Sequence, residues 1–260
     1  GYLGLQRTEI AAKVISKKGL GREEILWIRE EIAIHRRLRH RHVCTLHGAF
    51  EDLSKFTLCL SLCRGGSLTD TMLALVAVGK SMADHKVHLV LVQLLGAMRY
   101  LETLGISHRD IKLDNLCWTD TRESTMVLLD FGYASTIDEH SAFSGSAHYA
   151  APEVHRAGAD GGPPFSCSKA DVWSAGVCTF ALLATALPFG GSEETEEDRV
   201  GLRCKVCAGA WDVHPEGRPK AAWNVVERML VVEPRSRATI LELMELPWIG
   251  GELQVPWRGF

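Results

Sequence analysis

The sequence of 260 residues predicts an α+β fold in two unequal parts, a small strand-rich part to about residue 63 and a larger, mainly helical part beyond it. Three observations support this prediction. Short runs of β-branched residues recur in the first part, and apolar residues at helical spacing dominate the second. Between them, the pair Gly65 and Gly66 interrupts the pattern and indicates a hinge.

In the first part, we expect a helix over residues 22–39 and strands over residues 8–16, 43–50 and 56–62. Alternation along the first strand places Ala11, Lys13 and Ile15 on one face. Taken alone, a lysine between two apolar neighbours is most often a charge on an edge strand. Glu30 and Glu31 of the helix, taken alone, indicate a solvated helix face.

In the second part, Ser67-x-x-Asp70 and Ser81-x-x-Asp84 predict capped helix starts, and the second of these helices is closed by Gly105. Residues 172–189 carry no formal charge and reach the length of a membrane-spanning helix. However, Ser168-x-x-Asp171 predicts a capped start for this segment too, and Pro188 ends it early. We therefore predict a buried central helix and no membrane partner.

The net charge and the cysteines of the sequence limit which binding partners and which cellular compartment we expect for the protein. The net charge of −3 does not favour nucleic acid as a partner of the whole chain. The basic run at residues 35–42 is typical of a solvated helix end. Eight cysteines without framework spacing indicate a reducing compartment, so we expect a cytoplasmic location, with the nucleus as the other candidate. Cys204-x-x-Cys207 is a lone thiol pair, more often two ordinary cysteines than a metal or redox site.

The segment from His108 to Asn115, with the sequence HRDIKLDN, carries the chemistry. A carboxylate such as that of Asp110 can orient a hydroxyl group and take its proton, and the ammonium of Lys112 can balance negative charge nearby. Residues 116–118 and 127–129 resemble a hairpin that returns Asp130 beside Asn115. Hard oxygen ligands suit magnesium, so these two side chains form a candidate metal site.

Several motifs occur in the order that resembles the eukaryotic protein kinase family: H-R-D-x-x-x-x-N, Asp130-Phe131-Gly132, Ala151-Pro152-Glu153 and the D-x-W-S-x-G motif that begins at Asp171. The lysine at position 112 resembles the serine/threonine branch of the family. Within that branch, the sequence most resembles the calcium/calmodulin-dependent and SNF1-like groups. The resemblance covers residues 8–249. It implies a two-lobed fold with an N-lobe at 1–63, a C-lobe at 64–249 and a tail at 250–260.

The resemblance also implies an activity, cofactors and site residues. A serine/threonine protein kinase uses ATP and magnesium to phosphorylate protein substrates. Ser146 would bridge the two catalytic residues, and buried Glu153 would pair with Arg237. Glu30 competes with Glu31 as the partner of Lys13. The implied roles are catalysis by Asp110 and Lys112, magnesium binding by Asn115 and Asp130, phosphate binding by Lys13 with Glu31, a gatekeeper at Leu60, and adenine binding by the backbone of Ser61 and Cys63.

One family feature is missing from this sequence. The glycine-rich loop that covers the phosphates should precede Lys13 by more than a dozen residues, which places it before Gly1; residues 1–4 correspond at best to the strand after it. Because the sequence begins without methionine, we expect a fragment or a processed product. A pseudokinase scaffold is the alternative if the chain is complete. The substrate and the oligomeric state are not predicted.

Overall fold

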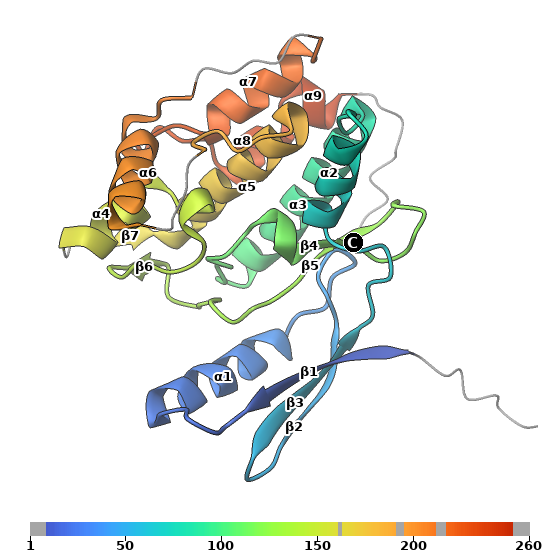
Figure 1. The fold of residues 1–260 in the computed structure, drawn as a ribbon, viewed down its shortest axis with the longest axis vertical. Helices are drawn as coiled ribbons and strands as arrows, with labels where there is room; N and C mark the ends of the chain where they lie inside the picture. Colours follow the sequence, from blue (N-terminus) through green and yellow to red (C-terminus); the bar gives the residue numbers. More distant parts are fainter. Residues whose placement is uncertain (1–8, 161–162, 191–194, 212–216, 252–260) are drawn as a thin grey trace, which may run out of the picture.

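The computed structural model of the chain describes residues 9–160, 163–190, 195–211 and 217–251. Figure 1 shows a small sheet with one helix beside it, joined to a larger helical part. The α+β fold in two unequal parts is confirmed. The strand expected after the glycine-rich loop, and all but the first two residues of the tail, lie outside the described residues.

The small part is a three-stranded antiparallel sheet packed against one helix. The strand order is β1-β3-β2, and Lys13 lies opposite Leu58 in the register. Along β1, exposed residues alternate with half-buried ones, so Lys13 does share a face with Ala11 and Ile15. These elements are β1 (Ile10–Ser16), α1 (Arg22–His35), β2 (Leu46–Glu51) and β3 (Lys55–Ser61).

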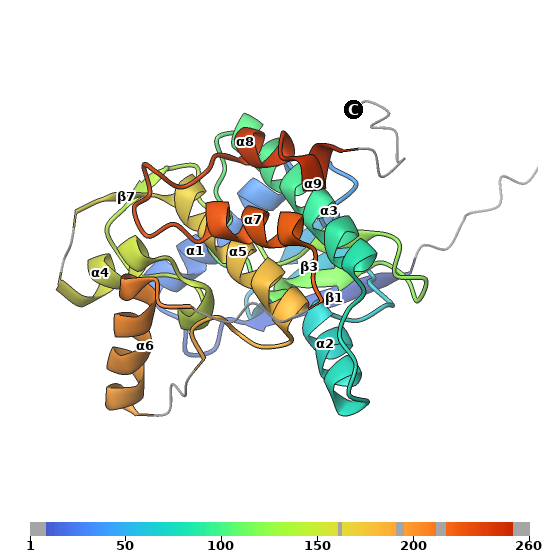
Figure 2. The same cartoon turned by 90° about the horizontal axis from the view of Figure 1, so that it is seen from above.

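The large part is mainly helical, with short strand pairs near the small part (Figures 1 and 2). Its elements are α2 (Leu68–Ala77), α3 (Asp84–Thr103), η1 (Leu113–Asn115), β4 (Leu116–Trp118), β5 (Met126–Leu128), β6 (Glu139–His140), η2 (Ala147–Tyr149), α4 (Pro152–Asp160), β7 (Phe165–Ser166), α5 (Cys167–Ala184), α6 (Glu196–Ala208), α7 (Lys220–Met229), α8 (Ile240–Met244) and α9 (Pro247–Gly250).

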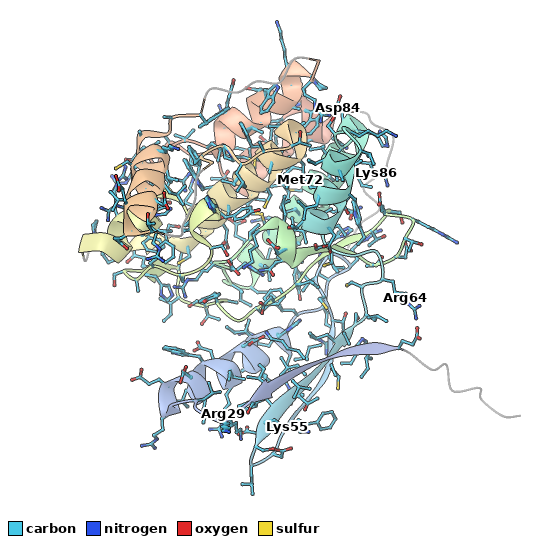
Figure 3. The ribbon with its side chains drawn as sticks, viewed as in Figure 1. Arg29, Lys55, Arg64, Met72, Asp84 and Lys86 are labelled. Carbon is cyan, nitrogen blue, oxygen red and sulfur yellow. The ribbon has the colours of Figure 1, made fainter. Side chains whose placement is uncertain are left out.

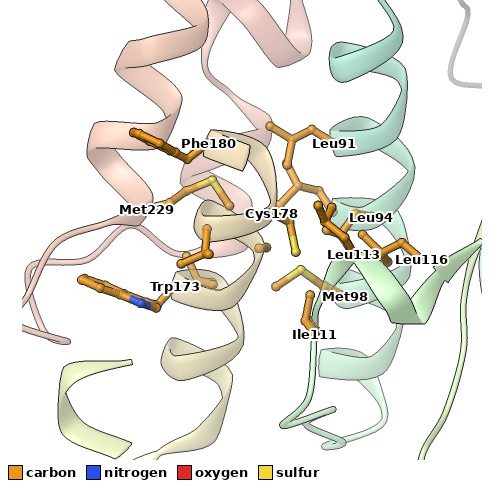
Figure 4. Packing of buried hydrophobic residues seen from close by; sticks show 14 of the residues in the cluster. Leu91, Leu94, Met98, Ile111, Leu113, Leu116, Trp173, Cys178, Phe180 and Met229 are labelled. Carbon is orange, nitrogen blue, oxygen red and sulfur yellow. The ribbon is translucent and has the colours of Figure 1, made fainter. Parts of the chain in front are cut away.

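Helix α5 is the centre of the large part, and every residue from 170 to 183 is buried. Figure 4 shows Trp173 and Phe180 on the side of Met229, with Cys178 toward the side chains of α3. A Cβ atom on Gly176 would lie 2.8 Å from Cβ of Met229, so glycine allows α7 to approach closely. The prediction of a buried helix is confirmed, and none of the helices described here is long and apolar enough to cross a membrane.

Two of the three predicted helix caps are wrong. Ser67 does cap α2, accepting a hydrogen bond from the backbone N–H of Asp70. In contrast, α3 begins after Ala83 and α5 after Ser166, both without a side-chain cap. Asp138 instead accepts from the N–H of Ser168 at 3.1 Å. At α5, therefore, a carboxylate from another segment takes the place of the predicted cap.

A buried ion pair joins α4 to the segment before α8. Arg237 donates to both carboxylate oxygens of Glu153, at 2.7 and 2.9 Å, and the guanidinium side chain is fully buried. Its Nη1 and Nε also donate to the carbonyls of Lys169 and Val231. The expected pairing of Glu153 with Arg237 is confirmed, and the paired charges compensate each other inside the core.

We predict that Arg237→Met lowers the free energy of unfolding by about 3–5 kcal/mol, because Glu153 then stays buried without a counter-charge. Urea unfolding of the purified protein measures this change. Arg235→Met is the matched control, since Arg235 lies two residues earlier and is exposed. Equal stabilities of the two variants would show that the pair contributes nothing to the fold.

Candidate active site

The loop from His108 to Asn115 is held by a carboxylate from the central helix α5. Asp171 accepts hydrogen bonds from the backbone N–H groups of His108 and Arg109, at 2.7 and 2.8 Å. Arg109 has a φ of 68°, in the left-handed region that costs a non-glycine residue energy. Burial raises the pKa of Asp171, while these N–H donors and nearby positive charge favour its charged form. The buried carboxylate fixes this loop conformation.

Three side chains, those of Asp110 and Lys112 in this loop and of Ser146 outside it, form a closed hydrogen-bonded cluster. Lys112 Nζ lies 2.9 Å from Asp110 Oδ2 and donates to Ser146 Oγ at 2.8 Å. The Ser146 hydroxyl donates to Asp110 Oδ1 at 3.0 Å. The expected bridge by Ser146 is confirmed, and the carboxylate of Asp110 is aimed at the position of a serine-like hydroxyl.

Asn115 is oriented by the same carboxylate. Its Nδ2 donates to the carbonyl O of Asp110 at 2.9 Å and to Oδ2 of Asp110 at 3.1 Å. This fixes the amide so that its oxygen Oδ1 has no hydrogen-bond partner within the described part of the chain. The N–H of Leu129 donates to the carbonyl of Asn115 at 2.8 Å, which brings the next residue, Asp130, beside it.

Lys13 joins the two parts of the molecule. Its Nζ lies 2.8 Å from Glu31 of α1 and 2.8 Å from Asp130 of the large part. Burial disfavours the ammonium, but the two carboxylates outweigh it and raise the pKa of Lys13. Burial likewise opposes charge on Asp130, yet the hydrogen bond from Lys13 lowers the pKa of that carboxyl. Glu31 is buried and Glu30 is exposed, so Glu31 is the partner.

The chain segment between the two parts carries the remaining predicted site residues. Leu60 packs against the buried cluster of the sheet. The N–H of Ser61 donates to the carbonyl of Thr45 at 3.0 Å. The N–H of Cys63 makes no hydrogen bond with any described residue. It is therefore free to donate to a ligand, as a role in adenine binding requires.

A protein kinase domain model matches residues 3–249. The chain belongs to the protein kinase family. The resemblance drawn from the motifs is thereby confirmed, and this kinase chain is also similar to individual curated proteins. It is 30% identical over 257 residues to the maternal embryonic leucine zipper kinase of Danio rerio, covering 96% of this chain and 35% of that protein.

The kinase of the same name from Xenopus laevis is 28% identical over 96% of this chain and 37% of its own length. Calcium/calmodulin-dependent protein kinase type II of Caenorhabditis elegans is 30% identical over 93% of this chain and 32% of its own length. The kinase chain thus spans about a third of the length of these relatives.

The loop-anchoring role of Asp171 is the functional feature that the sequence interpretation missed. The pattern Ser168-x-x-Asp171 had predicted a helix cap, but the carboxylate points to the loop at residues 108 and 109 instead. The sequence signal for this role is the D-x-W-S-x-G motif, which begins at Asp171.

We predict that Asp171→Asn increases amide hydrogen exchange at His108 and Arg109, because an amide offers one acceptor oxygen where the carboxylate offers two. Hydrogen exchange read by mass spectrometry over the loop measures this directly. Asp114→Asn, an exposed change in the same loop, is the control. Unchanged protection in the Asp171 variant would remove this residue from its positioning role.

Proposed function

We propose that the protein is a serine/threonine protein kinase that transfers the γ-phosphate of ATP to serine and threonine hydroxyls of protein substrates. The observation that carries this proposal is the convergence of four side chains from both parts of the chain. Lys13 contacts Asp130 at 2.8 Å, Asn115 contacts Asp110 at 3.1 Å, and the backbone of Leu129 and Asn115 joins the two pairs.

In this proposal, Asp110 orients the acceptor hydroxyl and accepts its proton. The side-chain hydroxyl of Ser146 already makes such a hydrogen bond, at 3.0 Å. Lys112 lies within 2.9 Å of the same carboxylate and presents positive charge to the transferring group. Positioned charge and proton transfer of this kind typically contribute about 10²–10⁴-fold to rate.

The donor set suits a hard cation with few protein ligands. Asp130 offers a carboxylate that is 46% exposed, and Asn115 offers the unpartnered oxygen of its amide. Magnesium is usually held by one or two carboxylates together with phosphates and water. Magnesium bound with ATP would neutralise negative charge on the phosphates. Among the described residues, no group of three or more His, Cys, Asp or Glu side chains could hold a metal ion.

The remaining proposals concern nucleotide binding and location. Lys13, held by Glu31, is placed to contact phosphates, and the backbone of Ser61 and Cys63 to bind adenine beside Leu60. The two lobes then meet between residues 63 and 64.

All eight cysteines are free thiols, which supports a reducing, intracellular location. No contact in the described residues favours the alternative of a non-catalytic scaffold.

We predict that Asp110→Asn lowers kcat by about 10²-fold or more while nucleotide affinity changes little, because the variant cannot accept the hydroxyl proton. The assay measures transfer from ATP to peptides whose acceptor is serine, threonine or tyrosine. Asp114→Asn, four residues away, is the control. Labelling mainly on tyrosine would contradict the acceptor class, and undiminished turnover in the Asp110 variant would contradict its role.

A further inference from the structure

Two cysteine thiols from distant parts of the sequence meet at one carbonyl oxygen. Sγ of Cys44 lies 3.8 Å and Sγ of Cys63 lies 3.9 Å from the carbonyl O of Ser61. Cys44 precedes β2 and Cys63 follows β3, at the end of the ladder where Leu46 pairs with Leu60. Arg64, the next residue, is labelled in Figure 3 near the connection between the two parts.

We propose that Cys44 and Cys63 are a modification site whose reagent is a peroxide, and that the disulfide formed between them weakens nucleotide binding. The first half stands on the thiol geometry alone. The second half rests on the proposed function, because it assigns adenine binding to the backbone of Ser61 and Cys63. Disulfides in reducing compartments are usually transient and serve catalysis or redox sensing, which matches a reversible pair at this place.

The two thiols differ in burial and in pKa, as expected of a pair in which one thiol reacts with the oxidant and the other closes the disulfide. Cys63 is half-buried, whereas the side chain of Cys44 is buried. The hydrogen bond between the two thiols lowers the pKa of Cys63 and, together with burial, raises that of Cys44. Cys63 is therefore the thiol that ionises and meets the oxidant first, and Cys44 is the resolving thiol beside it.

Hydrogen peroxide oxidises the two thiols to a disulfide in two steps. The Cys63 thiol ionises, and its thiolate attacks one oxygen of hydrogen peroxide. The O–O bond breaks and leaves a sulfenic acid and a hydroxide, which takes up the proton released by Cys63 to form the first water molecule. The Cys44 sulfur then attacks the Cys63 sulfur and loses its proton, and the sulfenic hydroxyl leaves; the products are one disulfide and two water molecules. The two thiols supply the two electrons that reduce the peroxide, and a dithiol reductant reverses the change.

Closing the disulfide should move Cys63 and leave Cys44 in place. The backbone of Cys44 is held on both sides, since its N–H donates to Leu128 at 2.9 Å and its carbonyl accepts from His35 Nε2 at 2.7 Å. The N–H of Cys63 has no partner among the described residues. A disulfide needs a sulfur–sulfur distance of about 2.05 Å, so the hinge backbone is drawn toward Cys44.

Cys117 is the competing partner, because its thiol is close enough to Cys63 to interact with it electrostatically. Burial raises the pKa of both Cys117 and Cys44, so position decides between them: the thiol of Cys44 shares the Ser61 carbonyl with that of Cys63. The surface thiol of Cys204 is exposed but lies on α6, far along the chain from this pair. It serves as the control cysteine.

The test treats the folded protein with hydrogen peroxide and maps disulfides by mass spectrometry without reduction. We expect a peptide cross-linked between Cys44 and Cys63 that dithiothreitol releases. With it, we expect about a tenfold loss in affinity for a fluorescent ATP analogue, since the N–H of Cys63 is drawn away from the position in which it would donate to the ligand. Reduced Cys44→Ser should bind the analogue normally, and peroxide should no longer weaken its binding. In Cys204→Ser, peroxide should weaken binding as it does in the unmutated protein.

Several outcomes would overturn the inference. The thiol pair is wrong if folded, oxidised protein contains no such peptide, or contains Cys63 linked to Cys117 instead. Mapping of the unmutated protein decides this even if Cys44→Ser does not fold. The coupling is wrong if the cross-link forms and affinity for the analogue is unchanged. A protein that forms the cross-link and binds the analogue but transfers no phosphate would contradict the proposed function alone.

Discussion

The ion pairs of Lys13 are the contact on which the candidate site depends. Lys13 belongs to the sheet, Glu31 to α1 and Asp130 to the large part, and one ammonium group lies 2.8 Å from both carboxylates. Because the three charges come from three elements, they converge only when α1 packs on the sheet and the two parts close on each other. The lysine that we propose binds phosphate and the carboxylate that we propose binds metal are thereby set side by side before any ligand binds.

The large part provides most residues of the candidate site, and burial around α5 stabilises it. Asp171 lies near the start of this helix and holds the backbone at His108 and Arg109. Arg109 and Asp130 both adopt left-handed backbone conformations, at φ values of 68° and 56°. Such conformations persist only where surrounding contacts impose them, so core packing and site geometry are linked through one buried carboxylate.

Much of this arrangement could be predicted from the sequence, because it follows from local pattern or family motif. Alternation predicted the face of Lys13, and the resemblance to the kinase family implied Ser146 as a bridge and either Glu31 or Glu30 as the partner of Lys13. What failed were features decided by distant contacts. The helix expected to residue 39 ends at His35, whose ring hydrogen-bonds the carbonyl of Cys44, and the thiol pair at Cys44 and Cys63 has no signature in linear spacing.

The most direct test of the role of the Lys13 ion pairs compares Glu31→Gln with Glu30→Gln in phosphate transfer from ATP to a serine peptide. Glu31 contacts Lys13 at 2.8 Å, whereas its neighbour Glu30 is exposed. We predict that Glu31→Gln lowers kcat/KM by about tenfold or more, because Lys13 loses a charge that positions it, and that Glu30→Gln leaves kcat/KM unchanged. Equal rates for both variants and the parent, or no transfer by the parent protein, would contradict this prediction.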